Sequence, residues 1–265
     1  MKKILPLIFT ALAVIFAGCA KEHHEAVIVA GSTSVQPYAE VLAEAFAHIR
    51  PDILVDIQGG GSSAGIMAVD TSVADIGMSS RLLKDSEKWM WHVEFARDGL
   101  AIILHPDNPV ENFTIEQLRG IYAAEITNWK DLGGKDARIH VITREEGSGT
   151  RAAFEELVMD GKFITPRAIV QASNGAVRQL VSNDKNSIGF ISLGLVDRTV
   201  KAASLGGVAA SRENITDESY SLYRPFLFIT NGAPEGDAKI FIDFALSPEG
   251  QRILSLEGLV EGMNP

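Results

Sequence analysis

The chain has 265 residues, of which 46% are hydrophobic, and its 24 Lys and Arg against 34 Asp and Glu give a formal net charge of −10. This balance argues against nucleic acid as a partner, because nucleic-acid-binding surfaces gather Lys and Arg. A single cysteine also excludes an internal disulfide framework. The length allows one large domain or two small ones.

The N-terminus has the pattern of a secretory signal. Lys2 and Lys3 precede an apolar run at 4–17, which is too short for a membrane span. We therefore predict a signal peptide at 1–18. Its removal takes away two lysines and no acid, so the net charge would change from −10 to −12.

The only cysteine, Cys19, directly follows this segment. Ala17-Gly18-Cys19 resembles the bacterial lipobox, whose cysteine becomes the acylated first residue. Phe16 departs from that motif, which prefers an aliphatic residue there. We expect lipidation at Cys19 and a polar tether at 19–25; cleavage by the ordinary signal peptidase, leaving no anchor, is the alternative.

After residue 26, strand-like and helix-like runs alternate, which predicts an α/β fold. Two helix starts are marked by caps: Thr114 with Gln117 matches a capping box, and Ser247 precedes Pro248. We expect strands at 27–30, 53–58, 74–78, 99–105, 138–142, 187–191 and 225–230. We expect helices at 36–49, 64–69, 115–123, 150–159, 175–181, 236–245 and 248–256.

Three loops share one pattern: a strand, then Gly with Ser or Thr, then a helix start. They lie at 31–35, 59–63 and 143–150. Such loops present N–H groups and hydroxyls at the positive end of a helix, which suits an anion. Arg144 adds a planar fork of donors matched to an oxyanion. Three such loops in one chain suggest one oxyanion pocket.

Each loop residue also has an ordinary interpretation. Thr33 and Ser34 could be plain helix N-caps, and so could Ser62. Arg144 could be a solvent-facing arginine, the commonest fate of that residue. The loops alone leave both interpretations open.

Other motifs in the chain are weaker. Gly59-x-Gly61-x-x-Ala64 loosely matches a dinucleotide fingerprint, but no acid ends the next strand. Gly61-x-Ser63-x-Gly65 matches the nucleophile elbow of hydrolases, with His92, His105 and His140 as candidate bases. The sequence contains no Gly-Lys-Ser/Thr phosphate loop and no credible metal-ligand spacing, so we expect no metal and no cofactor.

Four motifs occur in an order that resembles the periplasmic phosphate-binding protein family of phosphate ABC importers. They are Gly31-Ser32-Thr33-Ser34, 58–63, 75–81 and 144–150. The resemblance implies the type II periplasmic binding fold, in which two α/β lobes joined by two crossings close over a ligand. It places the crossings near 105–108 and 220–224, lobe 1 at 26–105 plus 225–265, and lobe 2 at 106–224.

The resemblance also assigns roles to site residues. Glu146 would pair with Arg144, and Arg81 would lie in a supporting position or at the surface. Ser80 takes the place of a carboxylate in some members, which puts selectivity for phosphate over sulfate in question. The phosphate-binding residues implied are Thr33, Ser34, Ser62, Ser80, Arg144, Ser148, Gly149 and Thr150.

The leading hypothesis is a monomeric lipoprotein, not an enzyme, that captures inorganic phosphate and delivers it to membrane permease subunits of an ABC transporter. Because the chain is acidic, its anion site should be buried, where nearby dipoles act and distant acids are screened. The alternatives are a sulfate-binding protein, a serine hydrolase using Ser63, and an envelope protein with a degenerate pocket.

Overall fold

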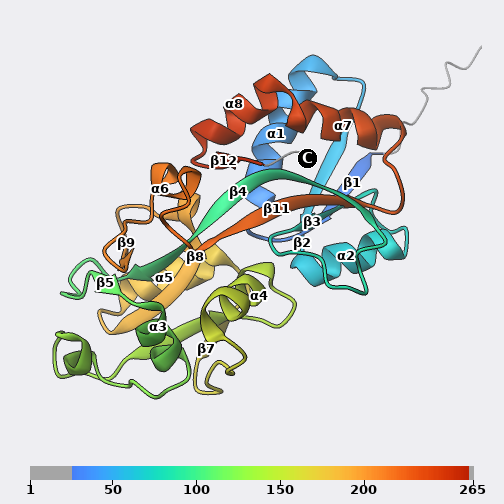
Figure 1. Cartoon of the computed structure of the whole chain (residues 1–265). Coiled ribbons are helices and arrows are strands. Elements are labelled where there is room, and N and C mark those ends of the chain that lie inside the picture. The colour runs from blue at the N-terminus through green and yellow to red at the C-terminus, as the bar shows by residue number, and fades with distance from the viewer. Residues whose placement is uncertain (1–25, 263–265) are drawn as a thin grey trace, which may run out of the picture.

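The computed structural model describes residues 26–262. The signal peptide predicted at 1–18, the predicted lipidation of Cys19 and the predicted tether at 19–25 lie outside the described residues. Within the described part, two α/β halves are joined by two long strands, β4 and β11 (Figure 1).

Three parallel strands and the helices between them form the first half. β1 lies between β2 and β3 and is parallel to both. The apolar residues Tyr38, Leu42 and Phe46 recur at helical spacing and are buried, so they fix the inward face of α1. The elements are β1 (Val27–Gly31), α1 (Gln36–Ile49), β2 (Val55–Gly59), α2 (Ser62–Asp70) and β3 (Ile76–Ser79).

The second half repeats this arrangement. β6 lies between β7 and β8 and is parallel to both. The helix that follows β6 continues as a π-helical segment at Glu155–Met159. The elements are β6 (His140–Arg144), α4 (Gly149–Phe154), β7 (Ile169–Gln171), α5 (Asn174–Asn183) and β8 (Ser187–Ser192).

The two long strands connect the halves. β4 (Trp91–Leu104) and β11 (Tyr223–Thr230) are antiparallel neighbours, and the strand order is β2-β1-β3-β11-β4-β8-β6-β7. The pairing of β4 changes near Gly99: its earlier residues pair with β11, and Leu100–Leu104 pair with β8. The lobe limits given above stay a prediction; by packing, Leu100 and Leu104 belong with the second half.

The remaining elements cover the sheet or edge it. α7 and α8 pack near α1, and α3 packs against the segment after α4. These elements are β5 (Asn112–Phe113), α3 (Ile115–Tyr122), β9 (Lys201–Ala202), β10 (Ser204–Leu205), α6 (Arg212–Thr216), α7 (Gly236–Leu246), α8 (Pro248–Leu256) and β12 (Val260–Glu261), with short 3₁₀ turns at Trp129–Leu132 and Leu193–Leu195.

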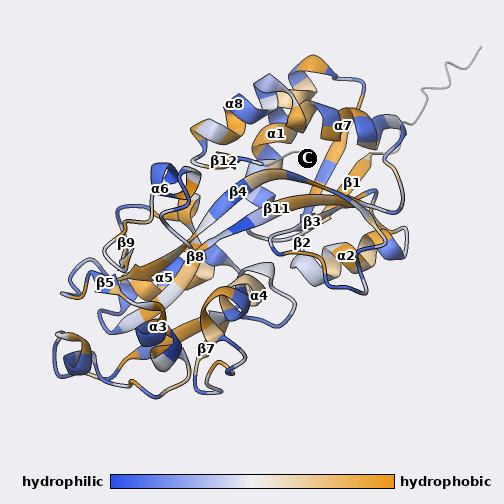
Figure 2. Cartoon of the chain, viewed as in Figure 1, coloured by the Kyte–Doolittle hydropathy of each residue, from blue (hydrophilic) through white to orange (hydrophobic). Residues whose placement is uncertain are grey.

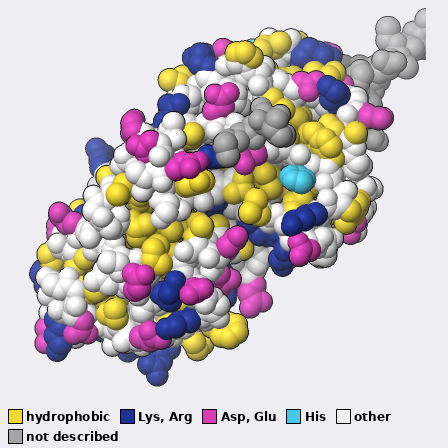
Figure 3. All heavy atoms as spheres, viewed as in Figure 1, with side chains coloured by type: hydrophobic (Ala, Val, Ile, Leu, Met, Phe, Trp, Pro, Cys, Tyr) yellow, Lys and Arg dark blue, Asp and Glu magenta, His cyan; other side chains and the backbone are white. Residues whose placement is uncertain are grey.

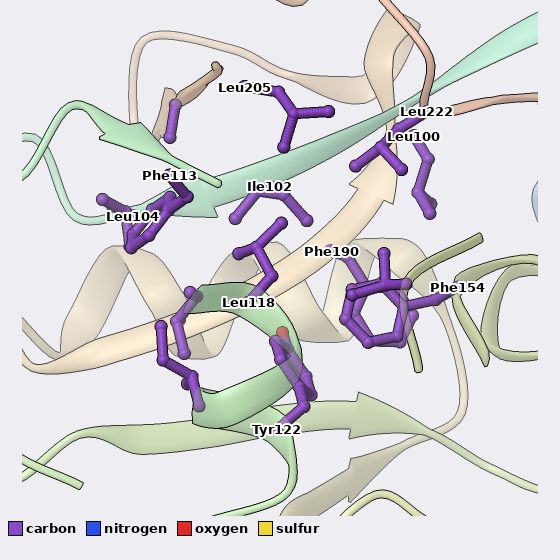
Figure 4. Packing of buried hydrophobic residues seen from close by; sticks show 14 of the residues in the cluster. Leu100, Ile102, Leu104, Phe113, Leu118, Tyr122, Phe154, Phe190, Leu205 and Leu222 are labelled. Carbon is purple, nitrogen blue, oxygen red and sulfur yellow. The ribbon is translucent and has the colours of Figure 1, made fainter. Parts of the chain in front are cut away.

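Each half has its own hydrophobic core. In the first, Phe95 stacks on Phe228 at a ring-centroid distance of 4.0 Å. In the second, Phe154 at the end of α4 stacks on Phe190 of β8 at 4.2 Å, as Figure 4 shows. This contact ties α4, which begins at the Gly-rich loop, to the sheet. In both halves the strands are mostly hydrophobic, although β4 and β11 each carry a hydrophilic stretch (Figure 2).

Most sequence-based elements are confirmed. The helices at 36–49 and 248–256 have the expected bounds, and Thr114 with Gln117 forms the capping box. One strand was predicted too short: β4 begins at Trp91, not at Gly99. The short strands β5, β7, β9, β10 and β12 were missed, as was α6.

On the face shown in Figure 3, Lys and Arg lie among Asp and Glu rather than in one basic patch. This mixed surface fits the expectation that any anion site is internal. None of the helices in residues 26–262 is long and apolar enough to cross a membrane.

Candidate anion-binding site

The motif residues lie where the two halves face each other, at the carboxyl ends of parallel strands. In open α/β sheets, ligands bind at these strand ends. β1, β2 and β3 lead into the first two motif loops and into Ser80, while β6 leads into the 144–150 loop. β7 leads into the start of α5 at Asn174. Segments more than 100 residues apart therefore meet at one place.

Hydroxyl groups form the centre of this site. Ser32 Oγ donates to Ser80 Oγ at 2.8 Å, and Ser80 Oγ lies 3.5 Å from Ser62 Oγ. The Ser80 N–H also donates to Ser62 Oγ at 3.1 Å. Across the halves, Ser34 Oγ lies 2.5 Å from Thr150 Oγ1. All five of these residues are at most 2% exposed.

Arg144 lies beside these hydroxyls with its side chain 1% exposed. Its NH2 donates to Thr33 Oγ1 at 2.9 Å, which is a contact between the halves. Its NH1 donates to Thr150 Oγ1 at 3.4 Å and to Asn174 Oδ1 at 3.2 Å. A rigid, buried guanidinium within a set of hydroxyls is well suited to bind an oxyanion.

Glycines allow the two halves to approach closely. A Cβ on Gly149 would overlap the hydroxyl oxygens of Ser62 and Ser80. Nearby, the Ser63 N–H donates to the Gly147 carbonyl at 3.2 Å. Only a residue without a side chain fits at position 149 in this arrangement.

The structure brings together all the residues that the sequence suggested for the anion site. Ser148 is buried, but its hydroxyl accepts from the Arg151 N–H and caps α4. Thr33 is half-buried at the edge of the cluster. The full set is Thr33, Ser34, Ser62, Ser80, Arg144, Ser148, Gly149 and Thr150.

The expected partner of Arg144 is wrong. Glu146 is exposed, and the ion pair is made by Glu145 instead. The carboxylate of Glu145 accepts from Arg144 Nε and NH2, both at 2.9 Å, so the contact is bidentate. Residue spacing did not reveal which of the two adjacent glutamates makes this pair.

Arg81 is buried rather than at the surface. Its NH1 and NH2 donate to the carboxylate of Glu87 at 2.7 and 2.9 Å, and NH2 also donates to Ser63 Oγ at 3.4 Å. This places Arg81 behind the second motif loop, beside a hollow of about 500 Å³ that both halves line. Its bonds hold it away from the central hydroxyls.

Two buried residues were missed. Ser32 lies in the first motif loop, and its hydroxyl bridges to Ser80 and accepts from the Ser34 N–H. Asn174 is the first residue of α5, and Ser173 is the cap of that helix. The Asn174 side chain instead donates to Ser34 Oγ at 2.8 Å and accepts from Arg144, so it links the halves.

The hydrolase motif does not assemble a catalytic triad among the described residues. Ser63 Oγ accepts from Arg81. His140 is bonded to Asp184 at 2.6 Å, while His92 contacts the Met90 carbonyl and His105 accepts from the Asp107 N–H. Residues 26–262 also contain no group of three or more His, Cys, Asp or Glu that could hold a metal ion.

The chain has two α/β halves that are joined by two long strands and meet at a buried set of hydroxyls with one guanidinium. These features define the class of two-lobed substrate-binding proteins. The PBP superfamily domain model matches residues 20–249. The chain is 30% identical to the phosphate-binding protein PstS of Borreliella burgdorferi over 275 residues, covering 98% of this chain and 99% of that protein. PstS of Bacillus subtilis is 29% identical over 272 residues, covering 95% and 90%.

Solved structures agree. A crystal structure with bound phosphate from Clostridium perfringens, assigned to a phosphate ABC transporter, is 44% identical and has a TM-score of 0.87, covering 89% of this chain and 99% of that one. An ABC-type phosphate transport receptor from Vibrio cholerae is 40% identical with a TM-score of 0.76, covering 88% and 99%. The chain belongs to the PBP superfamily, among the phosphate-binding proteins of phosphate ABC transporters, and has the type II periplasmic binding fold.

Proposed function

We propose that this chain captures inorganic phosphate between its two halves and delivers it to an ABC importer. One observation carries the proposal: hydroxyls from both halves and the Arg144 guanidinium form a single buried cluster, joined by the Ser34–Thr150 and Thr33–Arg144 contacts. A ligand bound there would contact both halves. Closure of two lobes around such a ligand is a common hinge motion.

The cluster is chemically suited to a tetrahedral oxyanion. Phosphate presents several oxygens that accept hydrogen bonds, and Ser, Thr and Arg side chains supply donors. Each hydroxyl can rotate, so bonds now made between hydroxyls can be exchanged for bonds to phosphate. Glu145 contacts the Arg144 guanidinium rather than a hydroxyl of the cluster. Its negative charge is therefore balanced by Arg144.

The comparisons support phosphate over the other ligands considered. The named relatives are phosphate-binding proteins, and the similar structure from Clostridium perfringens contains bound phosphate. Sulfate has the same shape and is the second candidate anion. A hydrolase is not favoured, because Ser63 is bonded to Arg81 and none of the three candidate histidines is its partner.

The cellular setting is part of the proposal. We place the protein in the periplasm or at the cell surface, as a monomer anchored through lipidated Cys19 and acting on permease subunits rather than as an enzyme. Stable anchoring needs more than one acyl chain, as a bacterial lipoprotein has. Cys19→Ala should release the protein from washed membranes; a variant that still fractionates wholly with membranes would contradict the anchor.

Titration calorimetry tests the binding function. The unmodified protein should bind inorganic phosphate, and Arg144→Ala should weaken binding at least tenfold, because loss of a buried charged hydrogen-bond partner costs about 2–5 kcal/mol. Arg178→Ala is the matched control, since Arg178 lies on α5 and contacts the Leu195 carbonyl and Asp197 instead. If the protein bound sulfate strongly and did not bind phosphate, sulfate rather than phosphate would be its ligand.

A further inference from the structure

A second buried arginine lies where the halves join. Arg224 on β11 faces Asp98 on β4 in the strand register, and both side chains are 1% exposed. Arg224 Nε and NH2 both donate to Asp98 Oδ2, at 3.1 and 2.9 Å. The two crossing strands each carry a hydrophilic stretch (Figure 2). Buried ion pairs are costly to desolvate, so one at this point calls for a reason.

The pair is connected to both halves. Ser192, the last residue of β8, donates to Asp98 Oδ1 at 2.7 Å. The Tyr38 hydroxyl lies 3.0 Å from Ser192 Oγ. Tyr38 is in the first turn of α1, and its N–H donates to the carbonyl of Val35 in the first anion loop at 3.0 Å. The chain of contacts therefore runs from the first anion loop, through Ser192, to the crossing strands.

Arg224 has a donor left over. Within the described residues, its NH1 is buried and has no hydrogen-bond partner. Burial lowers the pKa of Arg224, the Asp98 carboxylate opposes this, and the positive charge of Arg144 lowers the pKa further. The positive charges of Arg144 and Arg224 therefore oppose each other. An anion near both would relieve their repulsion and could satisfy the remaining donor.

We propose that Arg224 is a second positive group of the anion site, held in place by Asp98 and presenting its NH1 toward the bound anion. The assignment rests on the proposed phosphate-binding function and extends it. Asp98 is then a positioning residue: it fixes the Arg224 fork through two bonds, while Ser192 fixes Asp98. The crossing strands would supply charge to the site as well as join the halves.

Single substitutions separate a charge role from a purely structural one. Arg224→Gln removes the cation and leaves a buried acid near the anion, whereas Asp98→Asn removes the acid and leaves the cation. We expect phosphate to bind at least about tenfold more weakly to Arg224→Gln than to Asp98→Asn, a difference of about 1.4 kcal/mol. A smaller ratio of the two Kd values overturns the proposal. If the pair were only structural, loss of Arg224 and loss of Asp98 would weaken phosphate binding equally.

Arg97→Met is the matched control for loss of one charge. Arg97 is next to Asp98 on β4, so its side chain points to the opposite face of the sheet, where it pairs with Glu94 and lies over Tyr223. The Arg97→Met variant should bind phosphate with the same affinity as the unmodified protein. An equal loss in Arg97→Met and Arg224→Gln would show that net charge, not position, is responsible, and would overturn the proposal.

A double variant covers the case in which single variants do not fold. Asp98→Leu/Arg224→Met leaves no unpaired charge and keeps a packed interior. Phosphate gains its second negative charge between about pH 5 and pH 8. The phosphate Kd of the unmodified protein should fall as the pH rises over this range. The factor by which it falls should be at least about tenfold smaller in the double variant. An equal factor in both proteins overturns the proposal. Unmodified protein that does not bind phosphate would instead reject the proposed function itself.

Discussion

The hydroxyl of Ser34 lies 2.5 Å from the hydroxyl of Thr150, although 116 residues separate them in the chain. Ser34 precedes α1 in the first half and Thr150 lies in α4 of the second. Asn174, the first residue of α5, donates to the same Ser34 oxygen, so three segments of the chain meet at one atom. This contact holds the halves together at the place where we expect phosphate to bind.

Two adjacent glutamates make a matched test of how Arg144 is oriented. Glu145 holds the guanidinium by two hydrogen bonds of 2.9 Å, whereas Glu146 is exposed. Glu145→Gln can keep only one acceptor oxygen, so we expect phosphate affinity to fall about three- to thirtyfold, in keeping with about 1–2 kcal/mol for a charge-assisted bond. Glu146→Gln should leave the affinity unchanged in the same calorimetric assay. Equal effects of both variants would contradict this assignment.

Close approach at Gly149 can be tested with a single methyl group. In Gly149→Ala the new Cβ would overlap the hydroxyls of Ser62 and Ser80, so the halves could not close. We expect phosphate binding at least about tenfold weaker, since displacing a packed contact typically costs 1–3 kcal/mol. Gly175→Ala is the control, because its Cβ would meet only Ser173 at an ordinary distance of 3.8 Å. Unaltered binding in Gly149→Ala would show that closure at this point is not required.

Selectivity depends on Ser80. Monohydrogen phosphate differs from sulfate by one proton, and a carboxylate acceptor recognises that proton while repelling sulfate. The Ser80 hydroxyl can donate as well as accept, so it suits both anions. We expect Ser80→Asp to raise the ratio of sulfate Kd to phosphate Kd, although crowding by Ser32 and Ser62 should lower the phosphate affinity.

Competition binding at fixed pH measures this ratio. Sites built around a specific hydrogen bond discriminate by roughly 10⁴–10⁵, and the unmodified protein should fall well below that. If the unmodified protein instead ignores a thousandfold excess of sulfate, as about 4 kcal/mol of discrimination would require, Ser80 does not set the selectivity.

Buried tyrosines predict how stability depends on pH in the alkaline range. Burial raises the pKa values of Tyr38, Tyr122 and Tyr220. As the pH rises above about 10, the unfolded chain loses these phenol protons while the folded protein keeps them. The contribution of these phenols to the free energy of unfolding should therefore be complete below about pH 10. The free energy of unfolding should fall as the pH rises above that value.

Urea titrations at several alkaline pH values would measure this slope. Tyr220→Phe removes one of the three protons, along with the hydrogen bond to the Leu100 carbonyl. The variant should be less stable at neutral pH but should lose stability less steeply above about pH 10. Identical slopes in the variant and the unmodified protein would contradict the buried-phenol explanation.

Local patterns predicted most of the helices because their signals lie close together in the sequence. Apolar residues at helical spacing marked α1, and the caps at Thr114 and Ser247 marked two more helix starts. The residues that the motifs selected for the site do converge. The three similar loops suggested one pocket, whereas the two-lobed arrangement with its crossings came from the family resemblance and not from periodicity.

The misses have physical causes. β4 contains Glu94, Arg97 and Asp98 within its first nine residues, and these charges hide a strand whose partners lie more than 100 residues away on β11. Glu145 and Glu146 are the first and second residues after Arg144, so spacing along the chain does not decide which one pairs; in the structure it is Glu145. Asn174 directly follows Ser173, the cap of α5, and its contacts with Ser34 and Arg144 reach residues far away in the sequence.

A crystal structure of the protein with phosphate would test the central claim most directly. We predict a phosphate between the two halves, accepting hydrogen bonds from Arg144 and from hydroxyls of both halves, among them Ser62, Ser80 and Thr150. Phosphate bound within one half alone, or at a surface site away from these hydroxyls, would contradict the account.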